Sequence, residues 1–233
     1  MKPSRRRFLA GAAASCAVSA RAAAQAPAPD VDLLLVLLND GSGSIDADEY
    51  RLQREGTAAA LEHPQVLAAI GRLRTGAIAV AYGEWGTPGA PEAILPWTRI
   101  AGAADAAVFA DRLIAVPRRF QSYNAIGDAL EMGIAMIGAA PFRAARATID
   151  LAGDGPDMRS LVPAAAARDR AVAMGVTINA LAIQTEGAFS RFGPLREHYE
   201  TNVIGGPNAF VASARDRTDF AYAIFNKLVR EIS

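Results

Sequence analysis

Apolar runs alternate with segments of helical periodicity along the chain after residue 30. The first run, residues 31–38, is interrupted only by Asp32 and predicts a strand buried in a parallel sheet. Segments whose apolar residues recur every three or four positions predict the helices between the runs. Further strands are expected at residues 76–82, 92–100, 146–152, 176–183 and 209–212. Helices are expected at residues 46–61, 64–72, 105–115, 125–140, 161–174 and 216–232.

This alternation has one architectural consequence. Strands that are apolar throughout need cover on both faces, and helices between successive strands supply it. The fold class is therefore expected to be α/β, with a doubly wound, mostly parallel sheet and helices on both faces. Residues 31–233 are expected to form this one domain.

The N-terminal residues differ in character from the rest. Arg5, Arg6 and Arg7 precede an apolar stretch at residues 8–20, and the small residues of 22–24 or 24–26 follow as cleavage sites. This order is typical of a twin-arginine export signal, and the stretch is too short to span a bilayer. We expect residues 1–26 to be the signal, residues 27–30 a linker, and the protein to be periplasmic or secreted.

Removal of that signal changes the charge of the chain. Residues 1–26 hold five basic residues and no acidic one, so 19 basic and 24 acidic residues remain of 24 each. A net charge of about −5 argues against a nucleic-acid partner, which requires clustered positive charge. The only cysteine, Cys16, lies within the signal, so no disulfide is expected in the mature domain.

Candidate chemistry lies at the predicted strand ends. Asp40, Ser42 and Ser44 follow the first strand on alternate residues, and Asp154 follows the strand at 146–152. Open α/β sheets bind ligands beyond the carboxyl ends of their strands, where the loop at residues 121–124 can also reach. Two carboxylates with several neutral oxygens suit Mg²⁺ or Mn²⁺. The sequence thus predicts a hard-cation site at this edge.

The pattern Asp40-Gly41-Ser42-Gly43-Ser44 with Asp154 downstream resembles the Asp-x-Ser-x-Ser…Asp signature of von Willebrand factor A domains. It is closer still to a bacterial family of exported A-like domains of unknown function. The segments that match this family cover nearly all of residues 31–233. They include 84–85, 96–98, 125–130, 149–156, 175–183 and 202–207. The resemblance implies a metal-ion-dependent adhesion site whose ion binds an Asp or Glu of a protein partner.

The resemblance also completes the ligand set and shows where this chain departs from it. A-type domains carry Thr in the second loop, and the matching position here is Asn124, whose amide oxygen can still coordinate. The expected metal ligands are therefore Asp40, Ser42, Ser44, Asn124 and Asp154. Asn39 and Gly41 replace residues that are usually apolar, and either change could weaken the site or abolish metal binding.

Two other functions stay open. A metal-assisted hydrolase needs a general base beside the ion. We expect no histidine near these loops, because the sequence predicts that His63 and His198 are surface residues. Ser42 lacks the flanking glycines of a nucleophile elbow. An interaction domain with a degenerate, metal-free site is the second alternative. We expect a binding domain rather than an enzyme, with Asp150 at the start of a strand and Asp157 in an exposed loop.

Overall fold

The computed structural model describes residues 28–233, apart from residues 120, 184–192 and 216–218. The predicted export signal lies outside the described residues. The strands are β1 (Asp30–Asp40), β2 (Ile78–Trp85), β3 (Glu92–Ile100), β4 (Arg143–Gly153), β5 (Val176–Ile183) and β6 (Val211–Ala214). The helices are α1 (Ala47–Glu62), α2 (Pro64–Gly71), α3 (Ala103–Ala115), α4 (Ile126–Gly138), α5 (Ala164–Ala173), α6 (Leu195–Asn202) and α7 (Phe220–Ile232).

The six strands form one sheet in the order β3-β2-β1-β4-β5-β6. Strand β1 lies at the centre and pairs in parallel with β2 and β4, while β3 alone runs antiparallel, beside β2. The β2–β3 connection is a short turn, which can join antiparallel neighbours but is too short for a parallel crossover. Strand order reverses between β1 and β4, so the ends of these two strands form the switch point of the sheet.

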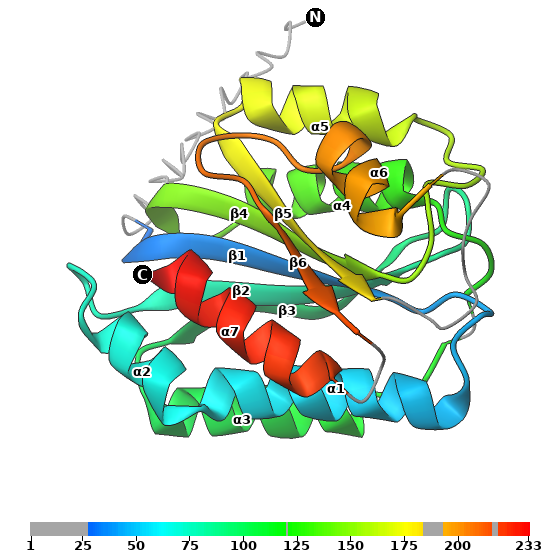
Figure 1. Ribbon diagram of the computed structural model, residues 1–233. Helices are drawn as coiled ribbons and strands as arrows, with labels where there is room; N and C mark the ends of the chain where they lie inside the picture. The colour runs from blue at the N-terminus through cyan, green and yellow to red at the C-terminus, as the bar shows by residue number, and fades with distance from the viewer. Residues whose placement is uncertain (1–27, 120, 184–192, 216–218) are drawn as a thin grey trace, which may run out of the picture.

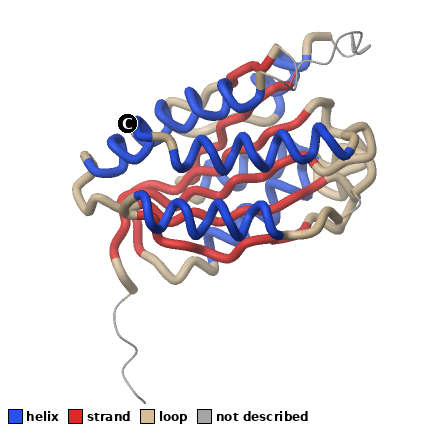
Figure 2. The backbone as a smooth tube through the Cα atoms, turned by 90° about the horizontal axis from the view of Figure 1, so that it is seen from below, coloured by secondary structure: helices blue, strands red, loops and turns tan. Residues whose placement is uncertain are grey.

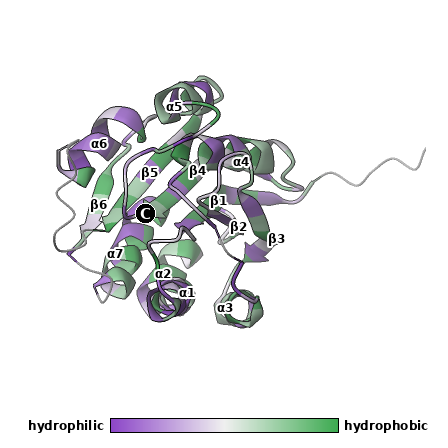
Figure 3. Cartoon of the chain, turned by 90° about the vertical axis from the view of Figure 1, so that its right-hand side faces the viewer, coloured by the Kyte–Doolittle hydropathy of each residue, from purple (hydrophilic) through white to green (hydrophobic). Residues whose placement is uncertain are grey.

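Helices cover both faces of the sheet. Figure 1 shows α4, α5 and α6 on one face and α1, α2, α3 and α7 on the other, and Figure 3 shows the same layers from the carboxyl edge of the strands. Figure 2 views the sheet from the side of α1, α3 and α7. The predicted fold class, an α/β doubly wound, mostly parallel sheet, is confirmed.

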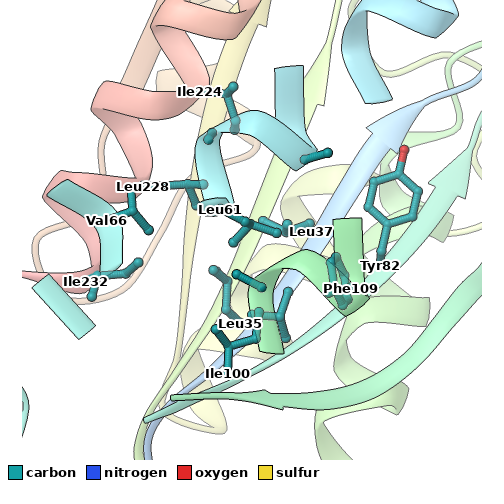
Figure 4. Close-up of a cluster of buried hydrophobic side chains, with 14 of the residues drawn as sticks. Leu35, Leu37, Leu61, Val66, Tyr82, Ile100, Phe109, Ile224, Leu228 and Ile232 are labelled. Atoms are coloured by element: carbon teal, nitrogen blue, oxygen red, sulfur yellow. The ribbon is translucent and has the colours of Figure 1, made fainter. Parts of the chain in front are cut away.

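The core lies in two layers, one on each face of β1. The side chains of β1 enter both layers in turn, because successive side chains of a strand point to opposite faces of the sheet. Leu35 and Leu37 join the cluster beneath α1, α3 and α7, which includes Phe109 and Leu228 (Figure 4), whereas Leu38 joins the cluster beneath α4. Burial of apolar surface on both faces fixes β1, and with it the position of Asp40 at its end.

The sequence predicted most elements close to their observed bounds. Strands β3 and β5 have the predicted ends, β1 and β4 extend further than expected, and β2 begins two residues later and ends three residues later than predicted. Helix α6 was not predicted. Within the described residues, no helix combines the length and apolar character needed to cross a membrane.

Candidate functional site

Three loops carry the candidate ligands: the first follows β1 (residues 41–46), the second precedes α4 (residues 121–125) and the third follows β4 (residues 154–163). The first and third of these loops meet at the switch point. Asp40 ends β1, and its Oδ1 accepts a hydrogen bond from the Ser42 backbone N–H at 2.7 Å. The hydroxyls of Ser42 and Ser44 lie 3.0 Å apart, and the Ser44 hydroxyl donates to Asp154 Oδ2 at 3.0 Å. A continuous chain of oxygen atoms therefore links two loops that are 110 residues apart in the sequence.

The second loop closes on the other two. A Cβ on Gly86 would lie 3.2 Å from both Ser42 Cα and the Tyr123 carbonyl oxygen, so only glycine lets these loops approach so closely. Asn124 lies against the third loop: a Cβ on Gly155 would lie 2.6 Å from its Nδ2. The Asn124 carbonyl also accepts the Met158 N–H at 2.7 Å. The structure thus gathers all five predicted residues at one edge, as the three-loop argument required.

Two carboxylates, those of Asp40 and Asp154, lie close together at this edge. Asp40 is 1% exposed. Burial and then the charge of Asp154 raise the pKa of the Asp40 carboxyl well above its ordinary value, against the hydrogen bonds from Ser42. Among the described residues, Asp40 Oδ2 and Asn124 Oδ1 are buried and have no hydrogen-bond partner. Buried oxygens without donors are rare in folded proteins, so these two are free to accept a ligand.

The other carboxylates near this edge are already engaged. Glu84 accepts from Arg54 at 2.8 Å, Tyr50 at 2.8 Å and Tyr82 at 3.2 Å, so its charge is neutralised on the α1 face. Asp128 Oδ1 accepts the Leu161 N–H at 2.9 Å, and its Oδ2 accepts the N–H of Gly89 at 2.7 Å. These groups shape the loops, whereas Asp40 and Asp154 face one another.

The two unusual residues of the first loop have structural roles. Asn39 is buried, and its Nδ2 donates to the Thr57 hydroxyl of α1 at 3.3 Å, so its side-chain amide has a partner within the protein. The Gly41 N–H donates to the Trp85 carbonyl at 2.8 Å, so the loop is anchored to the end of β2. Neither residue distorts the path from Asp40 to Ser44.

Three expectations about nearby residues were wrong. Asp157 is not in a solvated loop: its Oδ1 accepts the Ile126 N–H at 3.0 Å, and its Oδ2 accepts the Ala164 N–H at 3.1 Å, so it caps both α4 and α5. His198 is not remote, because its Nε2 accepts the Asp157 N–H at 3.2 Å. Asp150 is buried and pairs with Lys227, but it lies in the middle of β4 rather than at the start of a strand.

Helix α6 also brings an unpredicted residue to the site. Tyr199 is fully buried, and its hydroxyl donates to the Gly155 carbonyl at 3.0 Å. Burial and the charges of Asp40 and Asp154 raise the pKa of Tyr199 well above its usual range. Leu195, Tyr199 and Val203 recur every four residues and pack against one hydrophobic cluster, so a short helical pattern was the signal that could have revealed this support.

The donor set fits a hard cation. Two carboxylates, two hydroxyls and an amide oxygen are the ligands that Mg²⁺ and Mn²⁺ accept, and two of these oxygens lack any donor. Within the described residues, no three His, Cys, Asp or Glu side chains are grouped so that they could hold a metal ion by themselves. Neutral oxygens would supply most of the coordination.

Comparison with protein-family models gives a match over residues 30–233 to a family described as "Protein of unknown function (DUF1194)". The chain belongs to this family. A search of curated proteins found no relative of this DUF1194 chain.

Solved structures with a similar fold are von Willebrand factor A domains and adhesins. The pilus adhesin SpaC of Lactobacillus rhamnosus GG superposes with a TM-score of 0.64 at 15% identity, over 87% of this chain and 30% of that one. A von Willebrand factor type A protein of Catenulispora acidiphila gives 0.59 at 20% identity, over 87% and 43%. The mussel byssus protein PTMP1, with a zinc-occupied MIDAS motif, gives 0.61 at 16%, over 87% and 46%.

The DUF1194 chain thus spans less than half the length of these three proteins. At such identities the likeness establishes the fold, which is that of a von Willebrand factor A domain.

Proposed function

We propose that this protein is an exported binding domain that holds Mg²⁺ or Mn²⁺ and uses it to bind an Asp or Glu of a protein partner. The proposed ligands are Asp40, Ser42, Ser44, Asn124 and Asp154, some of them acting through water. The bound ion supplies positive charge for the partner's carboxylate. The observation that carries the proposal is the buried Asp40 carboxylate beside Asp154, with an oxygen that has no donor among the described residues.

Binding is favoured over catalysis by the surroundings of the site. Hydrolysis would need a general base aimed at the ion. His198 is the nearby histidine, and its Nε2 accepts from Asp157 while its Nδ1 lies 3.3 Å from Asn202 Nδ2. Burial lowers the pKa of His198. Both ring nitrogens are engaged within the protein, and we therefore propose no catalytic activity.

Export by the twin-arginine route is part of the same proposal. It is supported by Arg6 and Arg7 ahead of the apolar N-terminal stretch. The folds of a pilus adhesin and a minor pilin are similar to this chain, which agrees with a protein that acts outside the cytoplasm.

Calorimetric titration of the purified protein with MgCl₂ or MnCl₂ tests the metal site. We expect heat of binding and a rise in melting temperature, since an ion at 100 times its Kd stabilises the folded state by about 2.7 kcal/mol. Asp40→Asn should abolish both effects. In EDTA this variant should be at least as stable as the wild type, because the amide removes a buried charge beside Asp154.

The matched control is Asp111→Asn, an exposed acidic residue of α3, which should bind the ion like the wild type. Absence of heat and of any melting shift at millimolar ion would reject the metal site and favour the degenerate alternative. Activity assays with generic phosphomonoester and ester substrates distinguish the hydrolase alternative from a binding domain. Turnover that Asp40→Asn abolishes would favour the enzyme over a binding domain.

A further inference from the structure

Two residues on the rim of the proposed site have a left-handed backbone. Tyr123 has φ 65° and Arg159 has φ 64°, a region that glycine and asparagine enter readily and bulky residues do not. Among the described residues, Asn208 is the one other non-glycine residue with positive φ, and asparagine is ordinary there. The strained pair directly flanks the site, because Tyr123 precedes Asn124 and Arg159 lies on the loop of Asp154.

Surrounding hydrogen bonds impose this strain. Before Tyr123, the buried Gln121 side chain accepts the Thr87 N–H at 2.9 Å, and the Ser122 N–H donates to the Thr87 hydroxyl at 2.9 Å. After it, the Asn124 carbonyl accepts from Met158. Strained backbone persists only where its surroundings over-determine it, and such residues cluster at binding sites.

The strain presents side chains to solvent. Tyr123 is 46% exposed, and the Arg159 guanidinium lies 4.7 Å from the centroid of its ring. A stacked guanidinium keeps its N–H donors in its own plane, where they can reach a carboxylate. No ion pair of Arg159 occurs in the described part of the chain, so its charge is available to a partner.

Two further apolar side chains extend this surface. Met158 is 43% exposed between Asn124 and Arg159, and Leu161 is 74% exposed, with its Cδ1 3.0 Å from where a Cβ on Gly89 would lie. We call Tyr123, Met158, Arg159 and Leu161 the docking platform. Three of the eight large apolar side chains that are exposed in the described residues therefore lie on two loops beside the site. Binding residues lie disproportionately on loops that a rigid scaffold positions, as these two loops are.

We propose that the docking platform selects the protein partner of the metal site. The partner is an acidic loop with an apolar residue: one carboxylate for the ion, an apolar side chain for Tyr123 and Met158, and a second carboxylate for Arg159. Charge complementarity with the unpaired guanidinium selects this occupant. The inference rests on the proposed function and adds which partner chemistry the site accepts.

Selection from a phage-displayed library of random cyclic peptides tests the platform. With wild-type protein in Mg²⁺, the selected peptides should carry two acidic residues and an aromatic or large aliphatic one. The binding of a selected synthetic peptide should weaken about tenfold in Tyr123→Ala and in Arg159→Gln, the range of central interface residues. Calorimetric Mg²⁺ affinity should not change in either variant.

A double-mutant cycle isolates the second carboxylate. Replacing it in the peptide by an amide should weaken binding to the wild type but not to Arg159→Gln.

Tyr123→Gly should raise the melting temperature by a few degrees while it weakens peptide binding, which a purely structural tyrosine would not do. Tyr222→Ala on α7 and Arg112→Gln on α3 are exposed matched controls and should bind like the wild type.

The outcomes separate the two proposals. A library that yields no Mg²⁺-dependent peptide, or peptides that bind Tyr123→Ala and Arg159→Gln as tightly as the wild type, would overturn the platform while Mg²⁺ binding still stands. Peptide and Mg²⁺ binding that survive Asp40→Asn would instead overturn the metal site.

Discussion

Asp157 shows how a single side chain positions the loops around the proposed site. Its carboxylate accepts backbone N–H groups from the first turns of α4 and α5, and the Ser160 hydroxyl donates to it. A carboxylate at a helix N-terminus satisfies amides that have no partner within the helix and complements the helix dipole. The loops that carry Asn124 and Asp154 are thereby fixed by one residue between them.

We expect Asp157→Ala to lower the free energy of unfolding by about 3 kcal/mol, because hydrogen bonds to a charged group contribute roughly 1.5–3 kcal/mol and buried amides would lose their acceptor. Asp157→Asn should lower the free energy of unfolding by less, because one side-chain oxygen remains to accept a backbone hydrogen bond. Urea denaturation measures both. Asp169→Asn, an exposed residue of α5, should stay within about 0.5 kcal/mol of the wild type. An alanine variant as stable as this control would contradict the capping role.

At the scale of residues, the sequence predicted the site where the chemistry is local. Asp40, Ser42 and Ser44 lie at fixed spacing after a strong strand pattern, and Asp154 follows another. The roles of Asp157 and His198 depend instead on distant backbone atoms that no local pattern encodes. Asn39 shows the same limit, since its partner Thr57 lies 18 residues away on α1.

Helix α7 is held to the sheet by a buried polar cluster. Lys227 contacts Asp150 of β4 and lies 2.5 Å from Glu231 Oε1, which also accepts from Asn179 of β5 at 2.8 Å. Two acids and one base would leave a buried negative charge. Burial and then the charge of Asp150 raise the pKa of Glu231 to about 8, so Glu231 keeps a proton at neutral pH and the cluster is neutral.

This cluster predicts a pH dependence of stability. The folded state holds the Glu231 proton up to about pH 8, whereas the unfolded chain releases it near the ordinary value of 4.5. The stability that Glu231 contributes is therefore fully present below about pH 4.5 and is lost as pH rises towards 8, by up to about 1.4 kcal/mol per pH unit.

Thermal unfolding between pH 5 and 8 measures this slope. Glu231→Gln should flatten it and be the more stable protein at pH 8, because the amide imitates the protonated acid. Glu55→Gln, in an exposed ion pair on α1, should keep the wild-type slope. An equal slope in Glu231→Gln and in the wild type would show that Glu231 is ionised in the folded protein.

At the scale of elements, the central strands β1, β2 and β5 were recognisable because burial on both faces makes them largely apolar. Helix α1 was also recognisable, since Asp46 and Glu49 form the capping box that their spacing predicts. Helix α6 was missed because it is short and mostly polar, with Leu195 and Tyr199 as the two residues of the helix that pack against the core. Short helices of this kind are stabilised by tertiary contacts rather than by their own sequence.

The whole molecule separates its stabilising core from its proposed binding edge. Two hydrophobic layers hold β1 from both faces, while Asp40 ends β1 and Asp154 directly follows β4 at the carboxyl edge of the sheet. The sequence predicted an open α/β sheet, but pairing of β1 with β4 is a long-range choice that depends on packing over the entire fold. That pairing creates the switch point where Asp40 meets Asp154.

This separation predicts how metal binding changes the dynamics. Because each candidate ligand lies at one edge, Mg²⁺ should slow local amide exchange in the three loops around Ser42, Asn124 and Gly155. Local opening governs exchange there, whereas exchange at the opposite ends of β4 and β5, near Arg146 and Thr177, should change little.

Hydrogen exchange followed by mass spectrometry, with Mg²⁺ or EDTA, measures both regions in one experiment. Asp40→Asn should show no difference between the two conditions, since it lacks the charge that holds the ion. Protection in just one of the three loops would contradict a site that joins them. Equal protection at both ends of the sheet would mean that the ion acts on global unfolding rather than on the loops. The shared-ligand geometry requires all three loops to be slowed together, because an ion held by Asp40, Asn124 and Asp154 has to leave before any one of them can open.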